Sequence, residues 1–193
     1  VIDEAIAGNF NLIVSHHPLI FGGLKKITGS TDVQRSVIKA IKHDIAIYAA
    51  HTNIDNVING VSGRMADKLG LINKQVLIPK EGVLLKLVTF VPQLHAFSVR
   101  DALFAAGAGT IGNYDACSFN SEGLGTFRAG DQANPFVGKP GELHTEKEVR
   151  IEVILPAFLK AKVIDALLCS HPYEEPAYDV YQLQNEWNGV GMG

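Results

Sequence analysis

Two short polar clusters in the first third of the sequence have the side chains of a metal site. One reads Ser-His-His-Pro over residues 15–18, and the other reads His-Thr-Asn-Ile-Asp over residues 51–55. Imidazole and carboxylate ligands together suit zinc, iron, manganese, cobalt or nickel. Neither cluster contains cysteine, which argues against a thiolate-rich structural zinc site. These residue types therefore predict a divalent metal bound through nitrogen and oxygen atoms.

The spacing within the clusters favours two ions over one. His16 and His17 are adjacent, so their side chains leave the backbone in different directions and rarely bind the same ion. They suit two neighbouring ions, with a bridging carboxylate such as that of Asp55. Two ions about 3.5–4 Å apart can activate a water molecule and hold a polar substrate. His51 fits either of two roles, direct binding of an ion or orientation of a neighbouring ligand.

The elements around the two clusters are predicted to bring them together. Residues 12–14 and 45–50 are apolar runs typical of buried strands, and residues 33–41 carry apolar side chains at helical spacing. Residue types that cap a helix stand before this segment, at positions 30–32. The order strand, helix, strand predicts a βαβ unit with parallel strands.

Open sheets of parallel strands bind their ligands beyond the carboxyl ends of those strands. His16 and His17 follow the first strand immediately, and His51 follows the second. We therefore expect the three histidines and Asp55 at one edge of one sheet. A bare histidine pair is more often an ordinary surface turn. The second cluster at the neighbouring strand end is what favours the metal interpretation.

The second part of the chain has a different pattern, and we place a domain boundary near residue 80. Its predicted elements are a strand at 83–91, a helix at 99–106, a hairpin at 114–127, a strand at 149–155, a helix at 157–169 and a strand at 177–183. Ser98 and Asp101 resemble a capping box at the first of these helices. The order βαββαβ predicts a ferredoxin-like sandwich. The predicted fold class is thus α/β (α+β).

Composition disfavours some classes of partner. Hydrophobic residues make up 47% of the chain and charged residues 19%, with a net charge of -3. No basic field is present to attract nucleic acid, so we do not expect that partner. The apolar runs are shorter than the roughly 20 residues of a membrane helix, so we expect no membrane contact. The absence of a signal-peptide pattern predicts a cytoplasmic location.

Two further motifs are weaker candidates for chemistry. Residues 171–175 group a histidine with two glutamates, but the flanking prolines favour a shaped structural loop. The glycines of residues 107–112 resemble a phosphate-binding loop, yet they end a helix where such a fingerprint should begin one. We interpret both as structural.

Two of the motifs described above resemble the signature motifs of the Nif-three-like proteins, also known as GTP cyclohydrolase I type 2 homologues. They are Asn-Leu-Ile-Val-Ser-His-His-Pro-Leu-Ile-Phe at residues 11–21 and Ala-His-Thr-Asn-Ile-Asp-Asn at residues 50–56. Residues 84–184 are similar to the CutA- and PII-like domain that many bacterial members carry as an insertion. The matching stretches of that domain are residues 105–114, 134–138 and 171–178.

The resemblance divides the chain into three parts. Residues 1–80 would form part of the metal-binding domain, residues 81–185 the insertion domain, and residues 186–193 a linker that returns to the first domain. Val1 falls inside a predicted helix and the last residues form a glycine-rich turn, so we expect a longer natural protein. In the family, a further His and Glu ligand come from a late segment that lies beyond these residues.

The resemblance also implies an assembly and a cofactor. Members form toroidal homo-hexamers with two divalent metal ions per subunit, for which zinc, iron and manganese are the candidates. The family ligands map onto His16, His17 and Asp55, with His51 supporting them or binding directly. The cyclohydrolase name implies that metal-activated water attacks a purine ring. The alternatives to such a hydrolase are a metal-handling or regulatory hexamer without turnover and a scaffold, and the small-molecule substrate or effector is not identified by the sequence.

Overall fold

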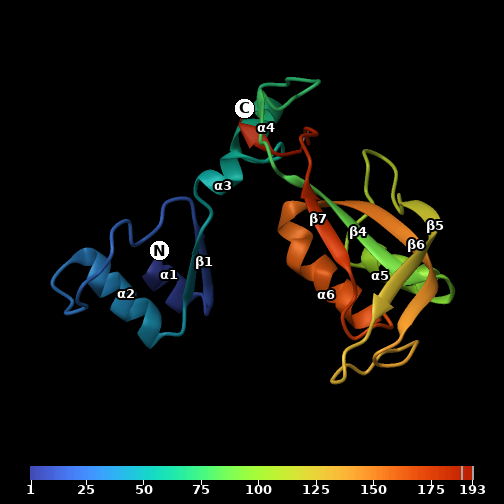
Figure 1. Cartoon of the computed structure of the whole chain (residues 1–193). Helices are drawn as coiled ribbons and strands as arrows, with labels where there is room; N and C mark the ends of the chain where they lie inside the picture. The colour runs from blue at the N-terminus through green and yellow to red at the C-terminus, as the bar shows by residue number, and fades with distance from the viewer. Residues whose placement is uncertain (188, 193) are drawn as a thin grey trace. The chain divides into compact units, whose positions relative to one another are not determined.

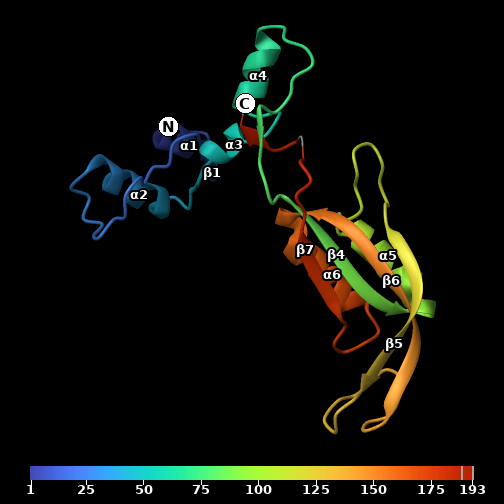
Figure 2. The ribbon, with the colours of Figure 1, turned by 45° about the horizontal axis from the view of Figure 1, so that its top comes forward.

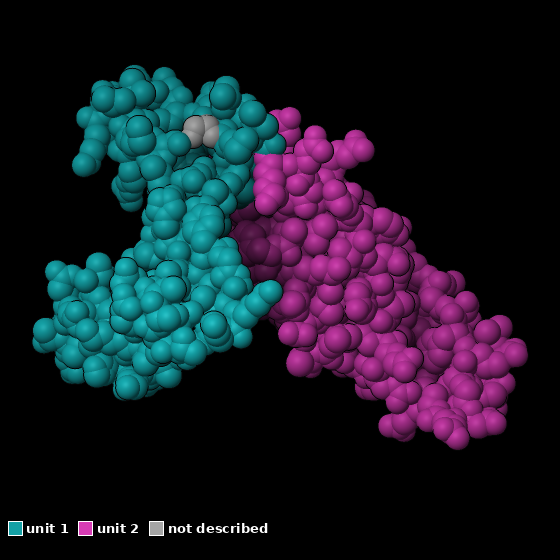
Figure 3. Space-filling model, turned by 90° about the vertical axis from the view of Figure 1, so that its left-hand side faces the viewer, with its two compact units in different colours: residues 1–79, 188–193 teal, residues 80–187 magenta. Residues whose placement is uncertain are grey.

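The computed structural model describes residues 1–187 and 189–192, which form two compact units (Figures 1 and 3). Unit 1 contains residues 1–79 together with residues 189–192, and unit 2 contains residues 80–187. Among the described residues, no helix has the length and apolar character needed to cross a membrane. The following paragraphs treat each unit by itself.

Unit 1 begins with the βαβ unit that the sequence predicts. Its elements are α1 (Ile2–Ala7), β1 (Leu12–Ser15), α2 (Asp32–Lys42) and β2 (Ala46–Ala49). The two strands pair in parallel, with Ser15 opposite Ala49 at their carboxyl ends. The prediction of parallel strands that end at the same edge is therefore confirmed.

Hydrogen bonds from side chains fix the start of α2. The Thr31 hydroxyl caps the helix by accepting a hydrogen bond from the Gln34 N–H at 3.3 Å. The amide oxygen of Gln34, which is buried, accepts hydrogen bonds from the backbone N–H groups of Thr28 and Ser30, both at 3.1 Å. The end of the loop that follows β1 is thereby tied to the helix, and the predicted cap is confirmed.

The rest of unit 1 consists of short elements. These are α3 (Thr52–Asp55), α4 (Val61–Lys68), β3 (Ile78–Pro79) and β8 (Gly191–Met192). The antiparallel pairing of β3 with β8 brings the described C-terminal residues back to unit 1. A Cβ atom at Gly60 would lie 1.8 Å from the Ile54 carbonyl oxygen, so only glycine allows α3 and α4 to meet this closely.

Unit 2 is a ferredoxin-like sandwich. Its principal elements are β4 (Leu84–Pro92), α5 (Ala96–Ala105), β5 (Phe119–Arg128), β6 (Leu143–Pro156), α6 (Lys160–Ser170) and β7 (Tyr178–Gln182). The four strands form an antiparallel sheet in the order β5-β6-β4-β7. Figures 1 and 2 show α5 and α6 on one face of this sheet, where Leu103, Val163 and Leu167 are fully buried against Leu87 and Ile151. The predicted fold class is confirmed.

The predicted hairpin at residues 114–127 is wrong. The structure has a single strand, β5, which pairs along its whole length with β6. Gly123 and Gly125 suggested a turn, but they lie inside the strand. At Gly125 a Cβ atom would lie 2.1 Å from a carboxylate oxygen of Glu148, so the glycine makes room for a side chain of the neighbouring strand.

The predicted capping box at α5 is also wrong. A short 3-10 helix, η1 (Gln93–His95), precedes α5, which therefore begins before Ser98. The Ser98 hydroxyl donates a hydrogen bond to the His95 carbonyl at 2.9 Å instead of capping the helix. This back-bonding is the alternative that serine side chains offer inside a helix.

Candidate metal centre

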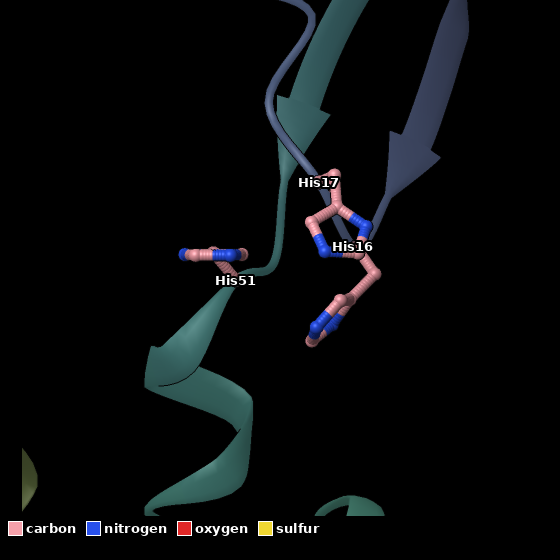
Figure 4. A group of neighbouring side chains, drawn as sticks. All are labelled: His16, His17 and His51. Carbon is pink, nitrogen blue, oxygen red and sulfur yellow. The ribbon is translucent and has the colours of Figure 1, made fainter. Parts of the chain in front are cut away.

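Three histidine side chains stand at the carboxyl ends of the two parallel strands (Figure 4). His16 and His17 directly follow β1, and His51 directly precedes α3 after the end of β2. The Ser15 hydroxyl donates a hydrogen bond to the His17 carbonyl at 2.9 Å, which shapes the turn at the end of β1. The Ala50 N–H donates to the Ser15 carbonyl at 2.8 Å and extends the strand pairing up to His51.

The three imidazole rings are close enough to share a ligand. The ring centroids of His16 and His17 are 4.8 Å apart, and those of His16 and His51 are 5.3 Å apart. The distance between the centroids of His17 and His51 is 5.4 Å. One ring nitrogen from each histidine lies within 4.8 Å of the other two. Residues from two strand ends thus present three nitrogen donors to one region of space.

The surroundings of the histidines leave them accessible. His16 and His17 are exposed, and His51 is half-buried. The Phe21 ring packs edge to face on His51, with 5.9 Å between the centroids and an interplanar angle of 87°. Phe21 therefore limits the movement of His51, while the other two rings can be reached from solvent.

A cavity of about 540 Å³ in unit 1 reaches His17. Its lining includes Arg35 and Lys39 of α2, and each of these cations pairs with a carboxylate, Arg35 with Asp32 and Lys39 with Asp3. A small polar molecule in this cavity would contact His17 and these paired charges.

The structure does not bring Asp55 into the histidine group. Asp55 is the last residue of α3 and is half-buried. It lines a separate cavity of about 250 Å³, together with Ser62 and Lys74. Three of the four residues expected at this edge therefore converge in the described part of the chain, and the role of Asp55 as a ligand stays a prediction.

The spacing of the three nitrogens is close to that of ligands on one metal ion. Zinc–nitrogen bonds are about 2.0–2.1 Å long, so two nitrogens on one ion are at most about 4.2 Å apart. The three nitrogens lie within 4.8 Å of one another, a limit wider than 4.2 Å, so binding of one ion by all three would require every pair of nitrogens to come within 4.2 Å. Their separations also fit ligands of two neighbouring ions, for which separations of about 3.5–4 Å between the metals are usual.

The sequence left the role of His51 open between a ligand and a residue that orients one. In the structure one ring nitrogen of His51 lies within 4.8 Å of a ring nitrogen of each of the other two histidines, and its role stays a prediction. The sequence signal for the proximity of His51 to the other histidines is its position directly after the second strand, because both clusters follow strands that end in register.

The weaker motifs have structural roles. His171 is buried, and its Nε2 lies 3.0 Å from the Phe90 carbonyl oxygen. Its Nδ1 accepts a hydrogen bond from the Tyr173 N–H at 3.0 Å, so the ring is neutral with its proton on Nε2. Gly107, Gly109 and Gly112 all have positive φ angles, as turn residues have after a helix.

A family model and several known proteins match this chain. The model of the family described as Duf34/NIF3 (NGG1p interacting factor 3) matches residues 1–153. The chain is 52% identical to the GTP cyclohydrolase 1 type 2 homolog of Halalkalibacterium halodurans, an alignment that covers 100% of this chain and 52% of that protein. The protein of the same name from Bacillus subtilis is 46% identical, with 100% of this chain and 52% of that protein covered.

A solved structure is similar to this chain. The crystal structure of a Bacillus cereus protein related to NIF3 matches with a TM-score of 0.77 and 49% sequence identity. The match covers 98% of this chain and 50% of that one. The chain thus spans about half the length of the relatives that it matches.

Proposed function

Because the chain belongs to the DUF34/NIF3 family, we propose that it contributes a divalent metal site and that the site serves a metal-dependent hydrolase. The observation that carries the proposal is the convergence of His16, His17 and His51 from two strand ends. Zinc, iron and manganese all accept imidazole and carboxylate ligands. The three histidines would hold the metal, which supplies a Lewis acid when bound.

The proposed substrate class is a nucleotide or a similar small polar molecule. Two features support it: the name of the relatives, GTP cyclohydrolase 1 type 2 homolog, which refers to GTP, and the cavity of about 540 Å³ beside His17. Cavities of this size accommodate small-molecule ligands. The proposed reaction adds one water molecule across a carbon–nitrogen bond of the ring, so that its atoms balance without an oxidant or a reductant.

A second candidate function is metal handling or regulation without turnover. The exposure of His16 and His17 favours it, because accessible ligands allow a metal to enter and leave. The two functions share the metal site and differ only in whether a substrate is converted. The homo-hexamer and the presence of two ions per subunit, with Asp55 as a further ligand, belong to the same proposal and are drawn from the family resemblance.

Elemental analysis of the purified chain tests the metal site. We expect zinc, iron or manganese to co-purify with the chain, and His17→Ala to lose most of that metal. His43→Ala is the matched control, because His43 is an exposed histidine of unit 1 outside the cluster. Equal metal content in both variants, or no metal in the parent chain, would contradict the proposal that these residues hold a metal ion by themselves.

An activity assay then separates the two functions. The metal-loaded chain is incubated with GTP and a panel of other nucleotides, and products are separated by chromatography. The hydrolase predicts ring-opened product that His16→Ala abolishes and His43→Ala does not. Metal binding without conversion of any nucleotide would instead support metal handling.

A further inference from the structure

A cavity of unit 2 lies on the sheet face opposite α5 and α6 and has no part in the proposed metal centre. Its volume is about 670 Å³, within the range of sites that bind small molecules. The floor is made by residues of β5 and β6, and the walls come from the segments around residues 129–136 and 173–177. All of these residues belong to unit 2.

A group of aromatic rings forms one side of this cavity. The Tyr173 ring centroid lies 5.8 Å from that of Phe127 and 6.3 Å from that of Phe136. Phe136 remains about half exposed, at 51% of its surface, although it lies beside two other rings. Exposed aromatic surface of this kind can pack against an apolar or planar ligand, and the ring faces attract cations.

A buried carboxylate lies at the floor of the cavity. Glu148 is 9% exposed, and its Oε1 accepts a hydrogen bond from the Tyr173 hydroxyl at 2.9 Å. Burial, together with the neighbouring Glu148 carboxylate, raises the pKa of Tyr173, so the hydroxyl stays protonated and continues to donate. Within the described residues, no group donates a hydrogen bond to the other carboxylate oxygen of Glu148, Oε2. Every side-chain oxygen that is fully buried in this part of the chain does have a hydrogen-bond partner. Oε2 is therefore not fully buried, and in this cavity it can accept a hydrogen bond from a ligand.

The segments around the cavity are held in place by hydrogen bonds. The Glu174 carboxylate accepts a hydrogen bond from the Asn134 N–H at 3.0 Å and so joins the two wall segments. The buried ring of His171 binds both the Phe90 carbonyl and the Tyr173 N–H. These contacts position the Tyr173 hydroxyl over Glu148. The cavity is therefore built from groups with fixed positions.

The charges that line the cavity favour a cation. Four glutamates line it, Glu122, Glu148, Glu174 and Glu175, against the two arginines Arg128 and Arg150. The Arg150 guanidinium already pairs with Glu152 at 3.0 Å, a carboxylate outside the lining. The net charge of the remaining lining residues is negative. The most buried of these charged residues, Glu148, is also negative.

We propose that this cavity binds an organic cation, an amine or guanidinium carried on a planar apolar body, with the cation on Glu148 and the body against Phe127, Phe136 and Tyr173. Charge-assisted hydrogen bonds to a carboxylate are stronger than neutral ones, and the loss of one typically lowers affinity by about tenfold or more. The site lies within unit 2, so a test of this proposal is independent of a test of the metal centre in unit 1.

A matched series of three indoles tests the site in the 193-residue chain. Tryptamine carries an ammonium group, tryptophol a neutral hydroxyl and indole-3-acetate a carboxylate, on the same planar body. Titration calorimetry should give binding of tryptamine at least about tenfold tighter than that of tryptophol. Indole-3-acetate should bind more weakly still. Equal affinities, a preference for the anion, or no binding of tryptamine would each overturn the proposal.

Two variants assign the binding to this cavity. Glu148→Gln keeps the shape and an acceptor for Tyr173 but removes the charge, so it should abolish the preference for tryptamine over tryptophol. Phe136→Ala should weaken both ligands while it preserves their ratio. Glu81→Gln, an exposed glutamate outside the cavity, is the control and should leave all affinities unchanged. An unchanged preference in Glu148→Gln, with a parent-like circular dichroism spectrum, would place any binding elsewhere.

Discussion

The imidazole rings of His16 and His51 lie 5.3 Å apart, although the two residues follow different strands and the whole of α2 separates them in the sequence. Their proximity results from the register of β1 and β2, in which Ser15 stands opposite Ala49. A shift of this register by one residue would move His51 along the strand axis by roughly 3.3 Å. The geometry of the candidate centre thus depends on the pairing of two four-residue strands.

Replacement of His51 by alanine should weaken metal binding. The ring nitrogen of His51 belongs to the group within 4.8 Å, and the proposed centre gives it the role of a ligand or of a residue that orients one. Loss of a residue that only orients a ligand typically costs about 10–100-fold in affinity, and we expect at least this loss. Competition with a coloured zinc chelator measures the affinity of His51→Ala and of the His43→Ala control. A value for His51→Ala within twofold of the control would contradict a role in the centre.

Replacement of Asp55 by asparagine tests whether a second ion depends on this carboxylate. Asp55 lies outside the histidine group in the structure. Its role as a ligand is only what the family resemblance implies. We expect Asp55→Asn to lower the number of ions bound per chain, while the histidine group retains its own ion. Elemental analysis after dialysis gives this number, and Asp115→Asn, an exposed carboxylate of unit 2, serves as control. An unchanged stoichiometry would remove Asp55 from the ligand set.

The stability of unit 2 should fall as the solution is acidified below the ordinary histidine pKa. Burial lowers the pKa of His171 from its ordinary value of 6.5, and nearby His95 lowers it further, whereas the bond to the Phe90 carbonyl opposes the shift. The unfolded chain then binds more protons than the folded chain, so stability decreases as pH falls through 6.5 toward the folded pKa. Above pH 6.5 this contribution is constant. Protonation of Nδ1 would also break its bond with the Tyr173 N–H.

Fluorescence of the only tryptophan can follow this effect. Trp187 lies in unit 2 and stacks on Phe158, with 6.1 Å between the ring centroids. Urea titrations between pH 7.5 and 5.5 should show a larger decrease in unfolding free energy for the parent chain than for His171→Gln, which cannot titrate. Parallel pH profiles for the two proteins would be inconsistent with a buried, neutral His171.

Truncation of Leu167 should destabilise unit 2 strongly. Leu167 on α6 is fully buried in the main core of the sandwich, whereas its neighbour Leu168 is 46% exposed. Loss of a buried leucine side chain costs about 2–5 kcal/mol, because it removes apolar contacts and leaves a cavity. Leu168→Ala should cost about 1 kcal/mol or less. Urea unfolding monitored at Trp187 compares the two variants, and similar midpoints would contradict the packing of α6.

The sequence by itself determined the features that depend on local patterns. The apolar run before His16, the capping residues around Thr31 and the second apolar run before His51 are each legible within about ten residues of chain. Parallel strands in a βαβ unit follow from this order by a general rule, so the shared edge of the three histidines was predictable. The signature residues at 11–21 and 50–56 were sufficient to indicate the family.

Only the tertiary structure decided features that depend on pairing between distant segments. β5 runs as one strand through Gly123 and Gly125 because β6 supplies partners along its whole length and Glu148 uses the space above Gly125. The bond between Tyr173 and Glu148 connects a loop to a strand in the middle of the chain, and no local pattern marks it. The separation of Asp55 from the histidines likewise depends on how α3 leaves β2. Side-chain direction at the end of a strand is set by the packing of the following segment, and sequence spacing alone does not specify that packing.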